Sequence, residues 1–166
     1  MATNQLSKGK VRVGKLQGSA VVSRTELTVA AARKHGSVNT ATIATTGNTD
    51  GYLLVPETGT LAGADFSGID ALAASDTNYI TFSITNLGQD GAGTTAMLAA
   101  TAANTTKTTG GAAIVANTKR ALTVHGTAAN LVVTAGDRLL VRAAATGTLA
   151  NTVTVPSYLL RFAGTT

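Results

Sequence analysis

Apolar and polar residues alternate strictly along residues 79–85. Ile80, Phe82 and Ile84 occupy every second position, and Thr or Ser residues separate them. Successive side chains of an extended strand point to opposite faces, so this spacing predicts a strand with one buried face and one polar face. Phe82 is therefore a predicted core residue, and the same alternation places Phe162 in the core.

Shorter segments of this type recur about every 8–12 residues, with Gly, Pro or Asp turn signals between them. The predicted strands cover residues 40–46, 52–55, 79–85, 94–101, 114–115, 121–124, 131–134, 139–142, 152–155 and 158–162. Asp50-Gly51 is interpreted as a turn, and residues 65–75 as a loop or a single helical turn. No helical pattern alternates with the strands, so the sequence predicts an all-β antiparallel sandwich or barrel.

The segment 23–36 fits two interpretations. A Ser-x-x-Glu capping box near its start and a Gly at its end are typical of a helix. Its central Leu-Thr-Val favours a strand, because Thr and Val lose side-chain freedom in helices. We favour a strand at residues 27–32 that is followed by a tight turn.

Positive charge is concentrated at the start of the chain. Residues 1–36 hold seven Lys/Arg and one acid, a net charge of +6, whereas residues 37–166 hold six Lys/Arg and seven acids, a net charge of −1. Basic and apolar residues alternate near the start, a pattern that favours a short edge strand once this segment finds a sheet to join. The sequence therefore predicts a basic extended arm at residues 1–25 and a β-sandwich domain at residues 26–166.

Composition narrows the class of protein further. Ala, Thr and Gly make up almost half of the chain, so the core is thin in aromatic residues, and we expect oligomerisation or docking to supplement it. Cys is absent, which excludes disulfides and thiolate chemistry. The start of the chain lacks the apolar stretch of a signal peptide, and no run approaches about 18 apolar residues, so we expect synthesis in the cytoplasm and no membrane partner.

Residues that perform catalysis or bind metals are few. The two histidines are His35, beside the cations of Arg33 and Lys34, and His125. Most of the acids stand beside Gly, Ser or Thr, where a carboxylate is typical of a turn. No serine lies in a Gly-x-Ser-x-Gly motif. We therefore expect a protein that is not an enzyme, with no catalytic residues, no metal site and no cofactor.

Four features belong together: the basic leader, the Thr/Ala/Gly-rich short strands, the segment 76–86 (Asp-Thr-Asn-Tyr-Ile-Thr-Phe-Ser-Ile-Thr-Asn), and the segment 135–141 (Ala-Gly-Asp-Arg-Leu-Leu-Val) with Gly147-Thr148 after it. Over residues 27–163 this set resembles the virion structural proteins of tailed bacteriophages, especially capsid decoration (cement) proteins. The resemblance implies a jelly-roll-like sandwich, a homotrimer on the capsid exterior, and an arm that spreads over neighbouring major capsid protein subunits.

The arm is then the predicted capsid-binding site. Its electrostatic anchors are Lys8, Lys10, Arg12, Lys15 and Arg24, and its apolar contacts are Val11, Val13 and Leu16. A basic arm complements an acidic capsid exterior, and many copies on one lattice multiply a modest affinity. The chain is accordingly expected in the virion after its synthesis in the host cytoplasm.

Two other partners can be weighed against the capsid. Nucleic acid is disfavoured, because the arm has no aromatic residue for base stacking and the body has no basic stripe. The alternative function is a carbohydrate-binding or host-adhesion module of a phage head or tail fibre. Sugars stack on exposed rings, and Tyr52, Phe66 and Tyr158 are the candidate rings for such a site.

Overall fold

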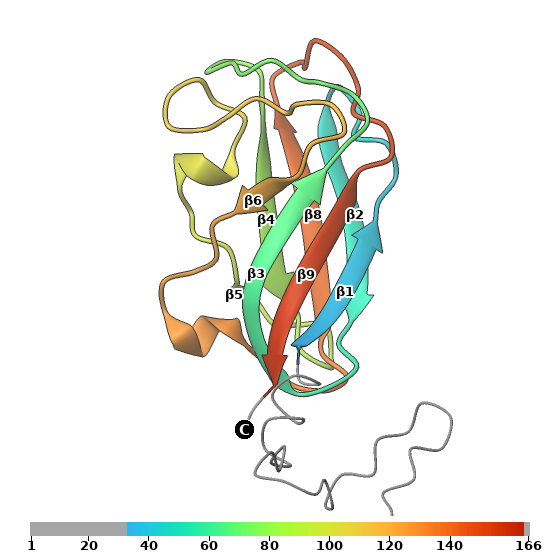
Figure 1. Cartoon of the computed structure of the whole chain (residues 1–166), viewed down its shortest axis with the longest axis vertical. Coiled ribbons are helices and arrows are strands. Elements are labelled where there is room, and N and C mark those ends of the chain that lie inside the picture. Colours follow the sequence, from blue (N-terminus) through green and yellow to red (C-terminus); the bar gives the residue numbers. More distant parts are fainter. Residues whose placement is uncertain (1–32, 165–166) are drawn as a thin grey trace, which may run out of the picture.

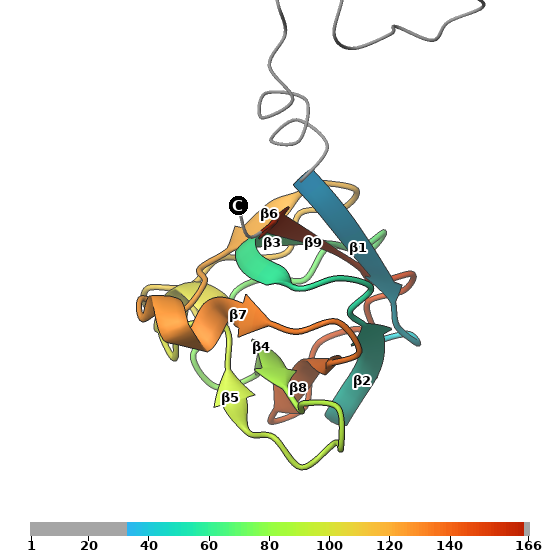
Figure 2. The ribbon, with the colours of Figure 1, turned by 90° about the horizontal axis from the view of Figure 1, so that it is seen from below.

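Two antiparallel sheets pack face to face in the computed structural model, which describes residues 33–164 (Figures 1 and 2). Sheet 1 has the order β1-β9-β3-β6, and β7 also pairs with β3. Its strands are β1 (Arg33–Asn39), β9 (Ser157–Gly164), β3 (Gly59–Ser67), β6 (Arg120–Leu122) and β7 (Val132–Val133). Sheet 2 contains, in order, β2 (Gly47–Leu54), β8 (Arg138–Thr146), β4 (Tyr79–Asn86) and β5 (Thr95–Ala96).

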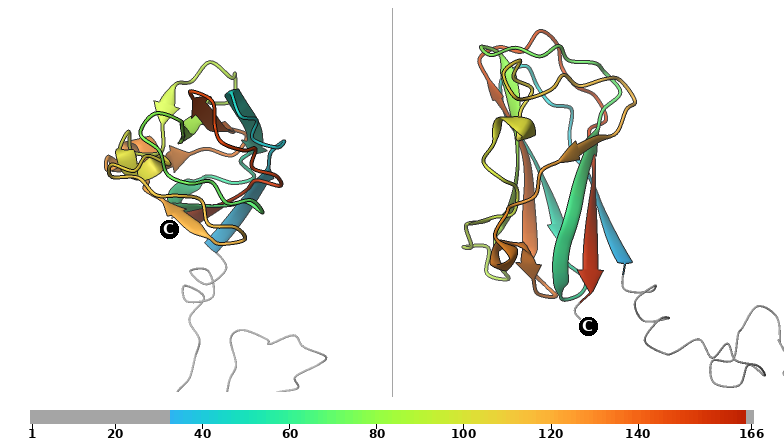
Figure 3. Two further views of the ribbon diagram at one scale, coloured as in Figure 1. Left: turned by 90° about the horizontal axis from the view of Figure 1, so that it is seen from above. Right: turned by 60° about the vertical axis from the view of Figure 1, so that its left-hand side comes forward.

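The strand order is that of a jelly roll. The first strand pairs with the last, β1 with β9, and the second pairs with the last but one, β2 with β8. The chain crosses between the sheets so that β3 lies beside β9 and β4 beside β8, which gives the two layers seen in Figure 3. The predicted all-β antiparallel sandwich is confirmed. The predicted arm and the strand at residues 27–32 lie outside the described residues.

Two 3-10 helices, η1 (Ala102–Asn104) and η2 (Ala128–Leu131), interrupt the connections on one side of the sandwich (Figure 1). Residues 33–164 contain no helix that is long and apolar enough to cross a membrane. Arg33 pairs with Ala163, so the described chain begins and ends at the same end of the sandwich.

Three aromatic rings join the two sheets at the centre of the core. Phe66 of β3 and Tyr158 of β9 come from sheet 1, and Phe82 of β4 comes from sheet 2. The centroid of the Phe66 ring lies 4.6 Å from that of Phe82 and 5.1 Å from that of Tyr158. Tilted and edge contacts at this range are favourable for aromatic rings. Ile80, Phe82 and Ile84 are all buried, so the predicted alternation of β4 is confirmed.

The segment after residue 32 forms β1, not the predicted tight turn. Alternate residues from His35 to Asn39 are exposed, and Gly36 and Val38 between them are buried, as in a half-buried strand. Gly36 suits its inward position because a Cβ there would lie 2.5 Å from Cδ2 of Leu53. Gly36 is therefore not a stop signal but a residue that permits β1 to pack closely on β2.

Asp50-Gly51 lies inside β2 and is not a turn. A Cβ on Gly51 would lie 2.7 Å from Cγ1 of Val38, so this glycine also faces β1 across the sandwich. Asp50 points to the opposite face and binds Arg142 of β8. Gly51 therefore occurs in this strand because it packs against β1, and Asp50 because it pairs with Arg142.

Several predicted boundaries were wrong. Residues 65–67, predicted as loop, end β3, and the sequence pattern hid this strand because its register shifts between Leu61 and Gly63. The strand predicted at 94–101 is reduced to β5 and an isolated bridge at Leu98. The predicted strands at 40–46, 114–115 and 152–155 likewise contribute only the bridges of Ile43 with Val153 and of Leu72 with Ile114.

Phe66→Ala is expected to lower the free energy of unfolding by about 4 kcal/mol, because it removes a fully buried ring that both sheets contact. Urea unfolding measures the change. Leu54→Ala is the matched control: Leu54 is 65% exposed, so its truncation should change stability by less than about 0.5 kcal/mol. Equal effects of the two substitutions would contradict this account of the core.

Candidate binding surface

The outer face of sheet 1 carries small side chains interspersed with a few long ones. We call this surface the sheet-1 face. It comprises His35, Ser37, Ala62, Lys119, Ala121, Leu159, Arg161 and Ala163, with Asp65 beneath Arg161. Leu159 is 38% exposed and lies between Ser37 and Asp65 in the strand register.

An ion cluster occupies the middle of the sheet-1 face. The Nη1 atom of Arg161 donates to Oδ2 of Asp65 at 2.6 Å, and Nζ of Lys119 lies 3.8 Å from the same oxygen. The carboxylate is almost fully covered, whereas the side chains of Arg161 and Lys119 are 39% and 67% exposed. Two cations around one acid leave this cluster with a net positive charge toward solvent.

Local backbone structure holds Arg161 flat against the sheet. Gly63 is the strand partner of Arg161, and a Cβ on it would collide with the guanidinium group. His35 is the partner of Arg161 on the other side and is exposed. The second carboxylate oxygen of Asp65, Oδ1, is buried without a hydrogen-bond partner, so the side chain is anchored through Oδ2 alone.

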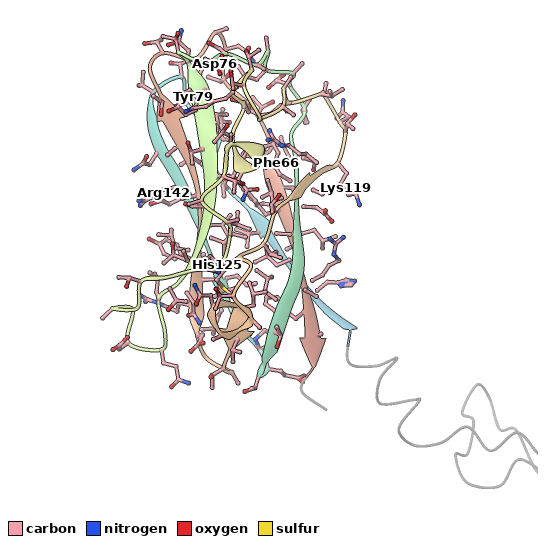
Figure 4. The ribbon with its side chains drawn as sticks, turned by 90° about the vertical axis from the view of Figure 1, so that its left-hand side faces the viewer. Phe66, Asp76, Tyr79, Lys119, His125 and Arg142 are labelled. Carbon is pink, nitrogen blue, oxygen red and sulfur yellow. The ribbon has the colours of Figure 1, made fainter. Side chains whose placement is uncertain are left out.

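The outer face of sheet 2 has a different chemistry. Nε and Nη2 of Arg142 donate to the two carboxylate oxygens of Asp50 at 2.6 and 2.7 Å, which closes a two-pronged ion pair. Tyr52 and Leu54 beside it are 61% and 65% exposed. Figure 4 shows Arg142 and Lys119 on opposite sides of the sandwich, with Phe66 between them. This ion pair is itself neutral, and Arg138, which precedes Arg142 by four residues on β8, is exposed on the same face.

A cavity of about 400 Å³ lies between β4 and the segment that follows β5. Its lining includes Ser83, Thr85, Ala96, Leu98, Thr101 and Lys107. Nζ of Lys107 sits 4.4 Å from the centroid of the Tyr79 ring, and hydrogen bonds with Thr146 and Lys107 lower the pKa of Tyr79. The volume falls in the range of small-ligand pockets, but hydroxyl groups and alanines dominate the lining.

The other aspartates tie loops together. Asp70 accepts hydrogen bonds from the amide and hydroxyl of Thr154, and Asp76 accepts them from the same groups of Thr109. These hydrogen bonds are the main reason that the pKa of each carboxyl is lowered. Turn chemistry therefore accounts for these two acids, whereas Asp50 and Asp65 lie in strands and bind arginines.

The structure describes only some of the binding residues that the sequence predicts. The predicted capsid-binding positions, residues 8–24, lie outside the described residues. Phe66 and Tyr158 were considered as sugar-stacking rings, but both are 1% exposed core residues, and burial raises the pKa of Tyr158. Tyr52 is exposed, as such a ring requires. His125 accepts a hydrogen bond from the amide of Thr127, which makes it part of a turn.

Sequence reasoning missed the ion cluster of the sheet-1 face. The alternation in 158–162 places Leu159 and Arg161 on the solvent side, and that signal was present in the sequence. No sequence signal placed Asp65 on the neighbouring strand. Among residues 33–164, no three His, Cys, Asp or Glu side chains gather as metal ligands would.

The strand order and the strand pairing together define an antiparallel jelly roll. Comparison with protein-family models, with curated protein sequences and with solved structures gave no match to this chain.

Asp50→Asn should reduce stability by about 1 kcal/mol at pH 7. The hydrogen bond from Arg142 lowers the pKa of Asp50 below its ordinary value of 3.8. A carboxyl with a lowered folded-state pKa stabilises the fold above its unfolded pKa, and this contribution disappears as the pH falls through the folded value. The difference between wild type and variant should therefore shrink below about pH 4.

Unfolding by urea at a series of pH values from 7 to 2.5 measures this difference. Arg142→Gln removes the same interaction from the other side and should abolish the same pH-dependent part of the stability. A difference between wild type and Asp50→Asn that stays constant across the series would show that the ion pair does not stabilise the fold.

Proposed function

We propose that this protein is a virion structural protein that decorates a tailed-phage capsid and stabilises it by binding across neighbouring major capsid protein subunits. The observation that carries the proposal is the separation of charge between leader and body. Residues 1–32 hold five Lys/Arg and one acid, a net charge of +4, and they enter the sandwich through β1. Such a leader complements an acidic protein surface.

The carboxylates of the sandwich are engaged within the fold, which supports a partner outside the chain. Each aspartate has an intramolecular hydrogen bond: Asp50 with Arg142, Asp65 with Arg161, Asp70 with Thr154, Asp76 with Thr109, Asp90 with the amide of Ala92, and Asp137 with Asn86. The one glutamate of the body, Glu57, cannot balance a net charge of +4. The positive charge of residues 1–32 thus exceeds what Glu57 could balance, which supports an acidic partner outside the chain.

The fold supports the proposal by analogy. Jelly rolls recur in viral capsid domains and in lectins, so the architecture is compatible with decoration without requiring it. β1 is the edge strand of sheet 1, so the leader joins the sandwich at an edge and not through its core. An extended leader that starts from an edge can add a strand to a sheet of a neighbouring subunit.

Self-association fits the same role. The core is built from few aromatic rings, and a homotrimer would bury further apolar surface. Three leaders in one trimer would bind neighbouring capsid subunits together, and each bound leader would raise the effective concentration of the next. A ligand that binds only the assembled shell stabilises that shell by mass action.

Neutralising the leader should abolish binding to capsids. In the full-length chain, Lys8, Lys10, Arg12, Lys15 and Arg24 are all replaced by Gln. Co-sedimentation is measured with undecorated capsids of tailed phages. We expect a loss of apparent affinity on the order of 100-fold, because the attraction is mainly electrostatic.

The matched control exchanges Lys for Arg, and Arg for Lys, at the same five positions, and it should bind like wild type because the charge is kept. Circular dichroism checks that both variants fold. Undiminished co-sedimentation of the neutral variant would refute the role of the leader, and absence of binding by the wild-type chain would refute capsid decoration.

A further inference from the structure

We propose that the cavity beside β4 binds an extended peptide segment, one residue of which runs parallel to β4 and pairs with the backbone of Phe82 and Ile84. The preferred segment has short side chains and a carboxylate that reaches Lys107. This inference goes beyond the proposed function and does not rest on it.

β4 is paired completely along one side only. On that side β8 pairs with its whole length, from Tyr79 to Asn86. On the other side β5 pairs only with Thr85 and Asn86. The chain after β5 then leaves β4 and meets it again at the isolated bridge of Thr81 with Thr105. The cavity is lined by both segments and lies in the gap between these two contacts, where a strand edge can accept a further chain.

Two backbone groups of β4 remain without a partner in this gap. The N–H of Met97 donates to the carbonyl oxygen of Ile84, and Thr106 bonds to both backbone groups of Ile80 on the same edge. Alternate residues of a strand direct their N–H and C=O to the same side, so the C=O of Phe82 and the N–H of Ile84 also point to this edge. In the described part of the chain, neither of these two groups takes part in a backbone hydrogen bond.

One residue of a parallel chain satisfies both groups at once. In a parallel pair, the N–H of a residue donates to the carbonyl that precedes its opposite residue, and its C=O accepts from the N–H that follows. The opposite residue here is Ser83, which stands between Phe82 and Ile84. An antiparallel chain would need the place across from Ile84, and Met97 already occupies it. The gap therefore selects a parallel orientation.

The lining of the cavity suits a peptide main chain better than a sugar. Its hydroxyl and methyl groups include those of Ser83, Thr85, Ala96, Ala100 and Thr101. A sugar would need an exposed ring to stack on, and the aromatic residue of the lining, Phe82, is buried with its ring against Phe66. Hydrogen bonds of the main chain need no such ring, and the small lining residues leave space for a ligand residue such as Ala or Gly.

Lys107 gives the cavity a preference for negative charge. It is the one ionisable residue in the lining, and no acid contributes to that lining. Its Nζ lies 4.4 Å from the centroid of the Tyr79 ring, at the start of β4. A carboxylate that enters here meets a cation without an adjacent fixed negative charge. In a parallel peptide, the acidic residue therefore precedes the residue that lies opposite Ser83.

Binding of a short peptide to the full-length chain tests the pairing directly. The probe is the N-acetylated and C-amidated peptide Glu-Gly-Ala-Gly, and its affinity is measured from the NMR shift of the Ile84 amide proton. We expect a dissociation constant in the millimolar range, because one paired residue and one exposed ion pair bind weakly. The same peptide with N-methylalanine in place of Ala lacks the N–H that donates to Phe82, and it should bind about tenfold more weakly.

Two pairs of variants locate the site. Ala100→Gln narrows the cavity and should weaken binding of the probe about tenfold, whereas Ala103→Gln, at an exposed position outside the lining, should bind like wild type. The probe should bind about threefold more tightly than the peptide Gln-Gly-Ala-Gly. Lys107→Gln should remove this difference, and Lys119→Gln, on the sheet-1 face, should keep it. Thermal unfolding confirms that all four variants remain folded.

Each outcome decides one part of the proposal. Weaker binding of the N-methylated peptide, together with weaker binding by Ala100→Gln alone, supports a peptide site at the edge of β4. An Ile84 amide that does not shift, or equal binding of the two peptides that differ in N-methylation, overturns it, and the cavity then holds only solvent. A preference for Glu over Gln that persists in Lys107→Gln overturns the role of Lys107. No capsid enters these measurements, so a failure to co-sediment with capsids overturns the proposed function alone.

Discussion

The contact of Phe82 with Phe66 and Tyr158 is the interaction on which the sandwich depends, because it is the place where large side chains of both sheets meet. Apart from Phe162, the rest of the hydrophobic core is aliphatic, and only six aromatic residues occur in the whole chain. Arg120 extends the cluster outward: its guanidinium carbon lies 5.3 Å from the centroid of the Phe82 ring. The same group donates to the carbonyl oxygens of Ala103, Thr105 and Ala112, so it fixes the long connection that follows β5.

Arg120 shows how a thin core is supplemented by polar contacts. Its guanidinium is half buried, and burial lowers its pKa, yet the group meets three carbonyl oxygens and one aromatic face. Buried charge is tolerated only where such partners compensate for lost hydration. The connection contains little regular structure, and the side chains of Arg120 and Asn104 hold it where the sequence pattern predicted strand pairing.

The local alternation of apolar and polar residues predicts a strand correctly where no contact with a distant segment requires an exception to that alternation. β4 was recognised because Ile80, Phe82 and Ile84 alternate with polar residues and all face the core. β1 was missed because its Gly36 is explained by Leu53, on another strand. β3 was missed for a similar reason, since Gly63 makes room for Arg161, almost one hundred residues later. Glycine in these strands reports close approach of distant segments, which no short window of sequence contains.

The same limit applies to the candidate surface. The excess of positive charge at the start of the chain is a property of the sequence and was recognised at once. The outward direction of Arg161 also follows from alternation. The contact of Arg161 with Asp65, and of Asp65 with Lys119, depends on the register between β9, β3 and β6. The sequence alone does not show that register. Charge can thus be counted from a sequence, but its balance on one face depends on strand order.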